Sequence, residues 1–317
     1  MSIYTITGGA GFIGSHLADA LLAEGHGVRV LDDFSTGRRD NLDSRCVVTH
    51  GDVRDPALVR AAMAGTSGCF HLAATASVER GNQDWLGTHS VNQTGTITVL
   101  DAARDLGGMP VVYASSAAVY GDIGMVAARE DMRVMPQTAY GADKLGSELH
   151  AHVGFAVHGV PSLGLRFFNV YGPRQDPLSP YSGVISIFAS LATAGLPLQV
   201  HGDGSQTRDF VFVQDVVDHM LAGMRHVSRH AGAERLNVCT GQAISVLALA
   251  QAIQMAQGRL AAAITHGPAR DGDIRYSVGD PSAAIAALGL RAAVSLEDGL
   301  AQTLRTFAGA LSPAFSR

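Results

Sequence analysis

Ile3-Tyr4-Thr5-Ile6-Thr7-Gly8-Gly9-Ala10-Gly11-Phe12-Ile13-Gly14 is the stretch that decides the fold of this chain. An apolar, β-branched run favours a strand, and it leads into glycines spaced G-x-x-G-x-x-G and then into a predicted helix over 15–24. The glycines permit a tight turn at Gly8, a close backbone approach to a pyrophosphate at Gly11, and close helix packing at Gly14. The free N–H groups of the helix would face the phosphates. The stretch therefore predicts a dinucleotide-binding unit.

A carboxylate at the end of the second strand selects the cofactor. Asp32 follows the apolar run Val28-Arg29-Val30-Leu31, at the distance where an acid accepts from the adenosine ribose 2′-hydroxyl. The same charge would repel a 2′-phosphate, which favours NAD over NADP. Arg38 and Arg39 follow shortly and leave NADP open as the alternative.

The remaining pattern alternates apolar strands with helices, which indicates an α/β fold with a doubly wound parallel sheet (Rossmann). Long helices are expected over 85–106 and 139–158. After Asn169 the pattern breaks into Pro- and Gly-rich stretches, so we place the NAD-binding domain at 1–170 and a smaller C-terminal α/β substrate domain at 171–317. Phe210–Phe212 and Leu236–Val238 are expected to return to the main sheet. Further strands are predicted at Ile3–Thr7, Val28–Asp32, Cys46–His50, Cys69–Ala73, Val111–Ser115 and Ser162–Arg166.

Composition excludes several classes of function. At 317 residues, 47% hydrophobic and with a net charge of -5, the chain reads as a globular protein without nucleic-acid or anionic-membrane partners. No apolar run approaches the ~20 residues of a membrane span, and no signal-like segment precedes the first strand. Cys46, Cys69 and Cys239 are odd in number and widely spaced, which predicts reduced thiols and a cytoplasmic protein.

A single lysine marks the predicted catalytic helix. Lys144 is the one lysine among 23 Lys+Arg residues, and it lies four residues after Tyr140, one helical turn away on the same face. A cation beside a phenol favours the phenolate, so we expect the pKa of Tyr140 to fall from about 10 towards neutrality. Tyr140 could then act as a base. Ser116, at the end of a predicted buried strand, would lie at the same sheet edge.

The whole chain resembles the extended short-chain dehydrogenase/reductase superfamily, and within it the nucleotide-sugar epimerases of the UDP-glucose 4-epimerase type. The matching segments occur in the family's order and are 7–16, 51–53, 71–74, 91–96, 115–121, 140–144, 166–174 and 202–210.

The resemblance implies an enzyme that uses NAD, takes a UDP-sugar, and works through a transient 4-keto sugar. Its catalytic residues would be Ser116, Tyr140 and Lys144. Besides these, the resemblance and the glycine-rich stretch assign cofactor contacts to Gly8, Gly11, Phe12, Ile13, Gly14, Asp32, Asp33, Ser35, Thr36, Gly37, Asp52, Val53, Leu72, Ala73, Ala74, Asn92, Ala114, Ser115 and Phe167. The implied substrate contacts, apart from Ser116 and Tyr140, are Ser77, Asn169, Gly183, Val184, Arg208, Arg270 and Ser277.

Departures from the family pattern bear on the reaction and the sugar. Related dehydratases and decarboxylases carry acids where this chain has Ala117 and Ala118, so elimination and decarboxylation are disfavoured. Ser277 stands where some epimerases carry a tyrosine that narrows the pocket, which admits N-acetylhexosamines beside glucose. Arg174 could instead meet a uronate carboxylate, which keeps UDP-glucuronate open.

Two features have simpler interpretations. His226 and His230 have a spacing that a metal could use, but no acidic or cysteine partner accompanies them in the sequence, and no metal site is predicted. Trp85 and the apolar face of 91–103 are expected to supply core or dimer contacts, and the resemblance implies a homodimer formed through two long helices per subunit.

Three functional hypotheses remain from the sequence. The first is a 4-epimerase that holds NAD through each turnover. The second is a dehydrogenase or 4-ketoreductase in which NAD(H) enters and leaves. The third, a non-catalytic NAD sensor, is disfavoured by the intact Tyr140–Lys144 pair.

Overall fold

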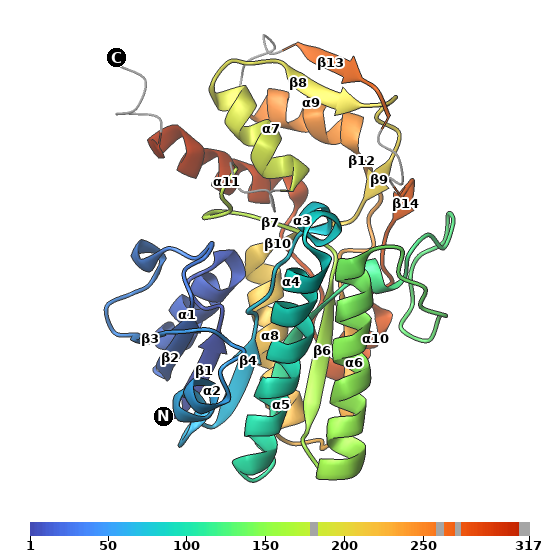
Figure 1. The fold of residues 1–317 in the computed structure, drawn as a ribbon. Coiled ribbons are helices and arrows are strands. Elements are labelled where there is room, and N and C mark those ends of the chain that lie inside the picture. The colour runs from blue at the N-terminus through green and yellow to red at the C-terminus, as the bar shows by residue number, and fades with distance from the viewer. Residues whose placement is uncertain (178–182, 258–262, 270–273, 311–317) are drawn as a thin grey trace.

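The main sheet of the computed structural model, which describes residues 1–177, 183–257, 263–269 and 274–310, has seven parallel strands. Their order is β11-β6-β5-β4-β1-β2-β3, so the order reverses between β1 and β4 (Figure 1). Loops that leave two strands in opposite directions open a crevice at such a point. The strands are β1 (Ile3–Thr7), β2 (Gly27–Asp32), β3 (Val47–His50), β4 (Gly68–His71), β5 (Val111–Ser116), β6 (Ser162–Phe167) and β11 (Ala233–Val238).

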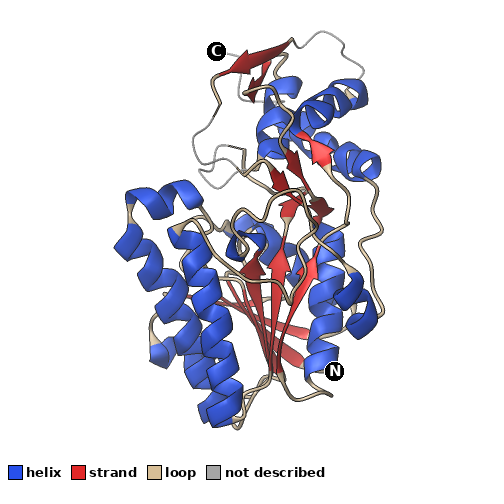
Figure 2. Ribbon diagram, turned by 90° about the vertical axis from the view of Figure 1, so that its right-hand side faces the viewer, coloured by secondary structure: helices blue, strands red, loops and turns tan. Residues whose placement is uncertain are grey.

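Helices cover both faces of this sheet (Figure 2). One face packs against α1 (Phe12–Ala23), α8 (Val213–Val227) and α10 (Ser282–Leu288), and the other against α2 (Pro56–Met63), α5 (Gly95–Asp105) and α6 (Ala139–His158). Strands buried on both faces carry continuous apolar runs, as the sequence pattern predicted. The doubly wound fold is confirmed.

A second, smaller group of elements packs around its own apolar cluster above the carboxyl ends of the strands (Figures 1 and 2). Its helices are α7 (Val184–Thr193), α9 (Val246–Ala256) and α11 (Leu296–Ala310). Its short strands pair as β13–β8 and as β12-β9-β14. Their bounds are β8 (Leu198–His201), β9 (Thr207–Arg208), β12 (Ile244–Ser245), β13 (Ile264–Gly267) and β14 (Tyr276–Ser277).

One expectation about the late strands was wrong. Residues 236–238 do join the main sheet, as part of β11 beside β6, but β10 (Phe210–Phe212) pairs instead with β7 (Asn169–Tyr171). The reason is that Phe210 and Phe212 pack into the second apolar cluster, while Val211 packs against the first. β10 therefore lies between the two cores.

The expected helix over 85–106 is interrupted. It consists of α4 (Trp85–His89), a π-helical turn η2 (Ser90–Thr94) and α5. A short helix α3 (Val78–Gln83) precedes it, and two 3-10 turns, η1 (Arg39–Asn41) and η3 (Ala117–Val119), follow β2 and β5. In the described part of the chain, no helix is long and apolar enough to cross a membrane.

Candidate active site

A cavity of about 700 Å³ lies along the carboxyl ends of the strands, at the point where the strand order reverses. The residues predicted to contact the cofactor line it, with the single exception of Asn92. Ser116, Tyr140, Asn169 and Gly183, all predicted to contact substrate, line it as well. The cavity thus brings together segments from residue 8 to residue 183.

The glycine-rich turn leaves room at one end of the cavity. Gly8 has φ +71°, and a Cβ there would lie 2.6 Å from the backbone nitrogen of Ala73. A Cβ on Gly14 would overlap the Gly8 carbonyl oxygen and approach Gly9 Cα to 2.7 Å. Because side chains are excluded there, the amino terminus of α1 reaches the cavity as bare backbone, which suits a pyrophosphate.

Two backbone donors hold the Asp32 carboxylate in place. The carboxylate is 7% exposed, and it accepts hydrogen bonds from the backbone N–H of Ala10 (2.9 Å) and of Phe34 (2.8 Å). A carboxylate has about four acceptor sites, so capacity remains for ribose hydroxyls. Burial raises the pKa of Asp32, and the two N–H donors lower it. The guanidinium of Arg38 donates to Asp176 at 2.6 Å, so its charge already has an acidic partner.

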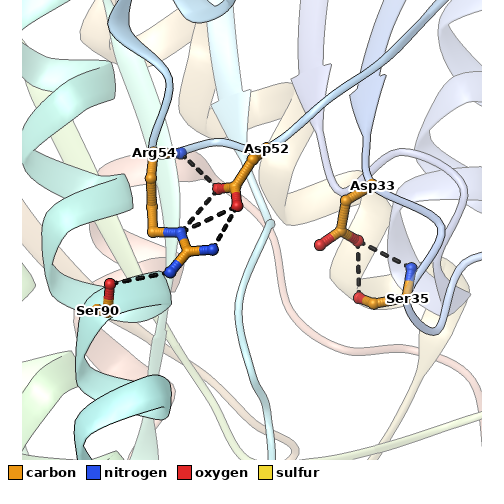
Figure 3. Close-up of polar contacts among 5 residues, drawn as sticks. All are labelled: Asp33, Ser35, Asp52, Arg54 and Ser90. Atoms are coloured by element: carbon orange, nitrogen blue, oxygen red, sulfur yellow. Dashed lines mark hydrogen bonds and ion pairs between the residues drawn. The ribbon is translucent and has the colours of Figure 1, made fainter.

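Two sets of polar contacts fix the loops that follow β2 and β3 at the cavity (Figure 3). Asp33 Oδ1 accepts from the backbone N–H (2.9 Å) and the hydroxyl (2.7 Å) of Ser35. Asp52 accepts from the guanidinium of Arg54, which also donates to Ser90 Oγ at 3.0 Å. The hydrogen bond from Arg54 holds the pKa of Asp52 below its usual range. The loop after β3 is thereby fastened to η2.

The three predicted catalytic residues lie together. Ser116 ends β5, and Tyr140 and Lys144 occupy the first two turns of α6, which starts at the Thr138 side-chain cap. Lys144 Nζ lies 5.8 Å from the centre of the Tyr140 ring and donates to the carbonyl of Ala114 at 2.8 Å. The lysine side chain is 5% exposed, so its hydrogen bonds are made in a poorly hydrated site.

The electrostatics of the pair differ from the sequence-based expectation. Burial raises the pKa of Tyr140, and a hydrogen bond with Ser116 lowers it in part. Burial also lowers the pKa of Lys144 to about 8, against the raising effect of Asp143. The expected fall of the Tyr140 pKa is therefore not seen, because desolvation of the phenol outweighs the lowering effect of Ser116.

Two of the predicted site residues, Asn92 and Ser77, do not line the cavity but hold backbone segments beside it. Asn92, in η2, accepts from the backbone N–H of Thr75 at 2.7 Å and donates to the Thr75 carbonyl at 3.2 Å. It holds the loop after β4, whose residues Leu72–Thr75 line the cavity. Ser77 is buried and caps α3 by accepting from the N–H of Arg80 at 3.1 Å, and it does not line the cavity.

Fewer of the predicted substrate contacts than of the predicted cofactor contacts line the cavity. Val184, Arg208 and Ser277 do not line the cavity; Arg208 donates to the Thr207 and Ile274 carbonyls at 2.8 and 2.7 Å. Arg208 and Ser277 are partners in the β9–β14 register. Arg270 lies outside the described residues.

Arg174, considered for a uronate carboxylate, lines the cavity but has an acidic partner on α1. Its guanidinium donates to Asp19 on α1 at 2.7 Å. The residue also adopts φ +66°, the left-handed region that non-glycine residues seldom enter.

Several lining residues were not predicted from the sequence. Arg54 could have been found from its position two residues after Asp52, a spacing that suits a local ion pair. The others depend on tertiary packing and include Asn41, Thr75, Arg80, Asp84, Gly87, Thr88, Gln175 and Asp176. Among the described residues, no group of three or more His, Cys, Asp or Glu could hold a metal ion.

Comparison with known proteins identifies the family. Residues 4–239 match the model of the NAD dependent epimerase/dehydratase family. The chain belongs to this family. It is 40% identical to a UDP-glucose 4-epimerase of Mycolicibacterium smegmatis over 309 residues, which cover 95% of this chain and 97% of that protein.

Solved structures of the family agree closely with this one. A UDP-glucose 4-epimerase of Thermotoga maritima with UDP-glucose superposes with a TM-score of 0.92 at 32% identity, covering 98% of this chain and 99% of the other. A Thermus thermophilus UDP-glucose 4-epimerase complex with NAD gives 0.89 at 34% identity, covering 98% and 100%. As a member of this family the protein is an NAD-dependent enzyme.

The residues present fit NAD. The cradle at Gly8 and Gly14 excludes any Cβ, Asp32 retains acceptor capacity, and Arg38 has an acidic partner rather than a free charge for a 2′-phosphate. These residues would hold the adenosine and pyrophosphate, while Tyr140, Lys144 and Phe167 line the cavity further along the sheet edge.

Proposed function

We propose that this protein is an NAD-dependent UDP-sugar 4-epimerase. The observation that carries the proposal is the group of half-buried Ser116 and Tyr140 with buried Lys144, which lines the same cavity as the dinucleotide cradle in a chain 40% identical to a UDP-glucose 4-epimerase. A base and a hydride acceptor must reach one carbon of the sugar, so the shared cavity suits this chemistry. Ala117 and Ala118 offer no second acid or base for an elimination.

In the proposed reaction Tyr140 takes the proton of the sugar C4 hydroxyl, and Ser116 hydrogen-bonds the same oxygen. NAD, which the Gly8–Gly14 cradle and Asp32 would hold, would supply reversible hydride transfer at C4; the hydride removed from one face of the sugar would return to the opposite face, with no net oxidation. Lys144, as an ammonium, stabilises the phenolate of Tyr140. The Ala114 carbonyl holds the lysine in place for this role.

The decisive experiment is NMR of the purified protein with UDP-glucose, UDP-N-acetylglucosamine and UDP-glucuronate in separate tubes, without added NAD. A C4-inverted product in any tube would support epimerisation with resident NAD and would identify the sugar. Net formation of NADH on adding NAD, with no inverted product, would contradict it in favour of a dehydrogenase or 4-ketoreductase.

Tyr140→Phe is the matched variant for this assay. It removes one hydroxyl from a buried site, so we expect turnover to fall at least about 100-fold, the scale of a general base. Bound NAD, measured after gel filtration, should remain. A wild-type rate in this variant would remove Tyr140 as the base.

We also propose that the protein forms a cytoplasmic homodimer through α4, α5 and α6. Leu149, Val153 and Val157 are 60%, 49% and 67% exposed at helical spacing on α6, and Trp85 and Leu86 are 69% and 80% exposed on α4. Exposed apolar side chains on these neighbouring helices favour a second copy as their cover. Val153→Glu should convert the dimer to a monomer in light scattering, and a wild-type mass below 40 kDa would contradict the proposal, since the chain is 33.0 kDa.

A further inference from the structure

The face of α6 that carries Tyr140 and Lys144 continues for one more turn. Glu148 follows at the same four-residue spacing, and each of the three side chains contacts the end of β5. Tyr140 lies close enough to Ser116 for that residue to lower its pKa, Lys144 donates to the Ala114 carbonyl, and Glu148 accepts from Ser115 Oγ at 2.5 Å. The helical turns that carry Tyr140, Lys144 and Glu148 therefore all lie against the end of β5.

Glu148 is one half of a buried ion pair. Its Oε1 and Oε2 accept from Nε (2.8 Å) and NH2 (2.6 Å) of Arg166 on β6, and the two side chains are 5% and 1% exposed. Removing two charges from water costs several kcal/mol each, so such a pair is weak evidence of stability. Its geometry, in contrast, is fixed, because a planar guanidinium and a carboxylate meet in one bidentate arrangement.

The guanidinium is held from its other side as well. Arg166 NH1 donates to Tyr120 Oη at 2.9 Å, and Tyr120 Oη donates to Asn237 Oδ1 at 2.7 Å. Asn237 lies on β11 and also donates to the Ala128 carbonyl at 2.9 Å. Elements on both sides of β6 therefore fix Arg166, and Arg166 fixes Glu148.

We propose that Glu148, Arg166 and Ser115 are positioning residues that set the depth of α6 against β5, and so place Tyr140 and Lys144 relative to Ser116. The proposal rests on the proposed function. Glu148 lies about 6 Å along the helix axis from Lys144, at 1.5 Å per residue. The Glu148–Ser115 and Lys144–Ala114 hydrogen bonds therefore join adjacent turns of α6 to β5. A displacement of about 1 Å at the base is enough to cost 100-fold in rate.

Ser115→Ala removes the hydrogen bond between Glu148 and β5 and leaves the ion pair intact. Because Ser115 also lines the cavity, bound NAD is measured beside kcat. We expect a folded protein that retains NAD, with kcat lowered about 10- to 100-fold and KM for the UDP-sugar within about two-fold. The pH profile of kcat should also change, since Tyr140 and Lys144 lose their fixed relation to Ser116. The control is Ser162→Ala, an equally buried serine at the other end of β6, and it should behave as wild type.

A second variant keeps the core filled. Glu148→Met with Arg166→Met replaces the pair by apolar side chains of similar length, which leaves no buried charge unpaired. It should retain NAD and show the same loss of kcat as Ser115→Ala. A folded Ser115→Ala or double variant with wild-type kcat and pH profile would overturn the proposal, and so would loss of NAD in place of loss of kcat.

A readout without substrate separates this proposal from the proposed function. The titration of Tyr140 can be followed as the 295 nm difference between NAD-loaded protein and Tyr140→Phe. Weakening of the Ser116 bond should shift that titration to higher pH in Ser115→Ala and leave it unchanged in Ser162→Ala. An unshifted titration would overturn the positioning role even if no UDP-sugar is epimerised, whereas absent epimerisation by the wild type would overturn only the function.

Discussion

Lys144 shows how one buried charge sets the working range of the site. Its ammonium is fully present below a pKa of about 8 and is lost as the pH rises through that value. Stabilisation of the Tyr140 phenolate requires the charged form, so activity should decline above about pH 8. Burial is the larger cause of the lowered pKa, and the neighbouring Asp143 partly offsets it.

Asp143→Asn tests whether the negative charge of Asp143 raises the pKa of Lys144. The asparagine keeps the shape of a residue that is 4% exposed but removes the negative charge beside Lys144. The pKa of Lys144 should then fall below 8, and the alkaline limb of the kcat/KM profile should move to lower pH, with the largest loss near pH 8.5. Asp101→Asn, in an exposed ion pair on α5, should leave the profile in place. An unmoved alkaline limb in Asp143→Asn would remove Asp143 as the offsetting charge.

For single residues, the sequence predicts which side chains lie close together but not how burial changes their pKa values. The spacing of Tyr140 and Lys144 places both on one helix face, and the structure has them there. The direction of the Tyr140 pKa was wrong because the spacing argument counts a nearby cation and omits desolvation. How deeply a phenol is buried depends on what packs over it, which no local pattern encodes.

Among the elements, α1 depends most on a single position. Gly14→Ala would bring a Cβ into the Gly8 carbonyl and to 2.7 Å from Gly9 Cα, and backbone atoms cannot move aside as a flexible side chain can. We expect the turn to open and NAD affinity to fall at least about 10-fold, as measured by calorimetry. Gly154→Ala on α6 is the matched control.

The Gly154→Ala control should leave NAD binding unchanged. A Cβ on Gly154 meets nothing within 4 Å, so the helix should gain about 0.5–1 kcal/mol with unchanged NAD affinity. Equal affinity loss in both variants would show that any added methyl, rather than the cradle, is responsible.

Helix ends were predictable where local chemistry fixes them. The range 139–158 agrees with the structure, where Thr138 caps the start and Gly159, at φ +68°, ends the helix. The π-helical turn within 85–106 was not predicted. Its Asn92 bonds a loop 17 residues earlier, and that tertiary partner leaves no periodic signal in the sequence.

The two halves of the molecule are joined across the cavity by the loop after β7. Pro173 O meets His16 Nε2 at 3.0 Å, Arg174 pairs with Asp19, and Asp176 pairs with Arg38. These three ties cross from the second half to α1 and to the loop beside Asp32. They are separated by 138 to 157 residues in sequence, so no local pattern could predict them.

Asp176→Asn should loosen this connection. A partly exposed ion pair contributes up to about 1 kcal/mol, so we expect bound NAD to dissociate roughly two- to five-fold faster, and the difference to shrink at 1 M salt. The rate can be followed as NAD released from preloaded protein. Asp43→Asn removes an ion pair remote from the cavity and serves as the control; equal rates in the two variants would show that the Arg38–Asp176 pair does not retain the cofactor.

The strand order also has a consequence for synthesis on the ribosome. β6 carries Arg166, yet its outer neighbour β11 is supplied by residues 233–238, about seventy residues later. Until those residues emerge, β6 is an open edge of the sheet in the nascent chain. Tyr120, which accepts a hydrogen bond from Arg166 in the folded protein, then lacks Asn237 as its own acceptor. Exposed edges of this kind promote aggregation. Messages truncated before residue 233 should therefore yield insoluble product, even though the dinucleotide cradle at residues 8–14 is already complete.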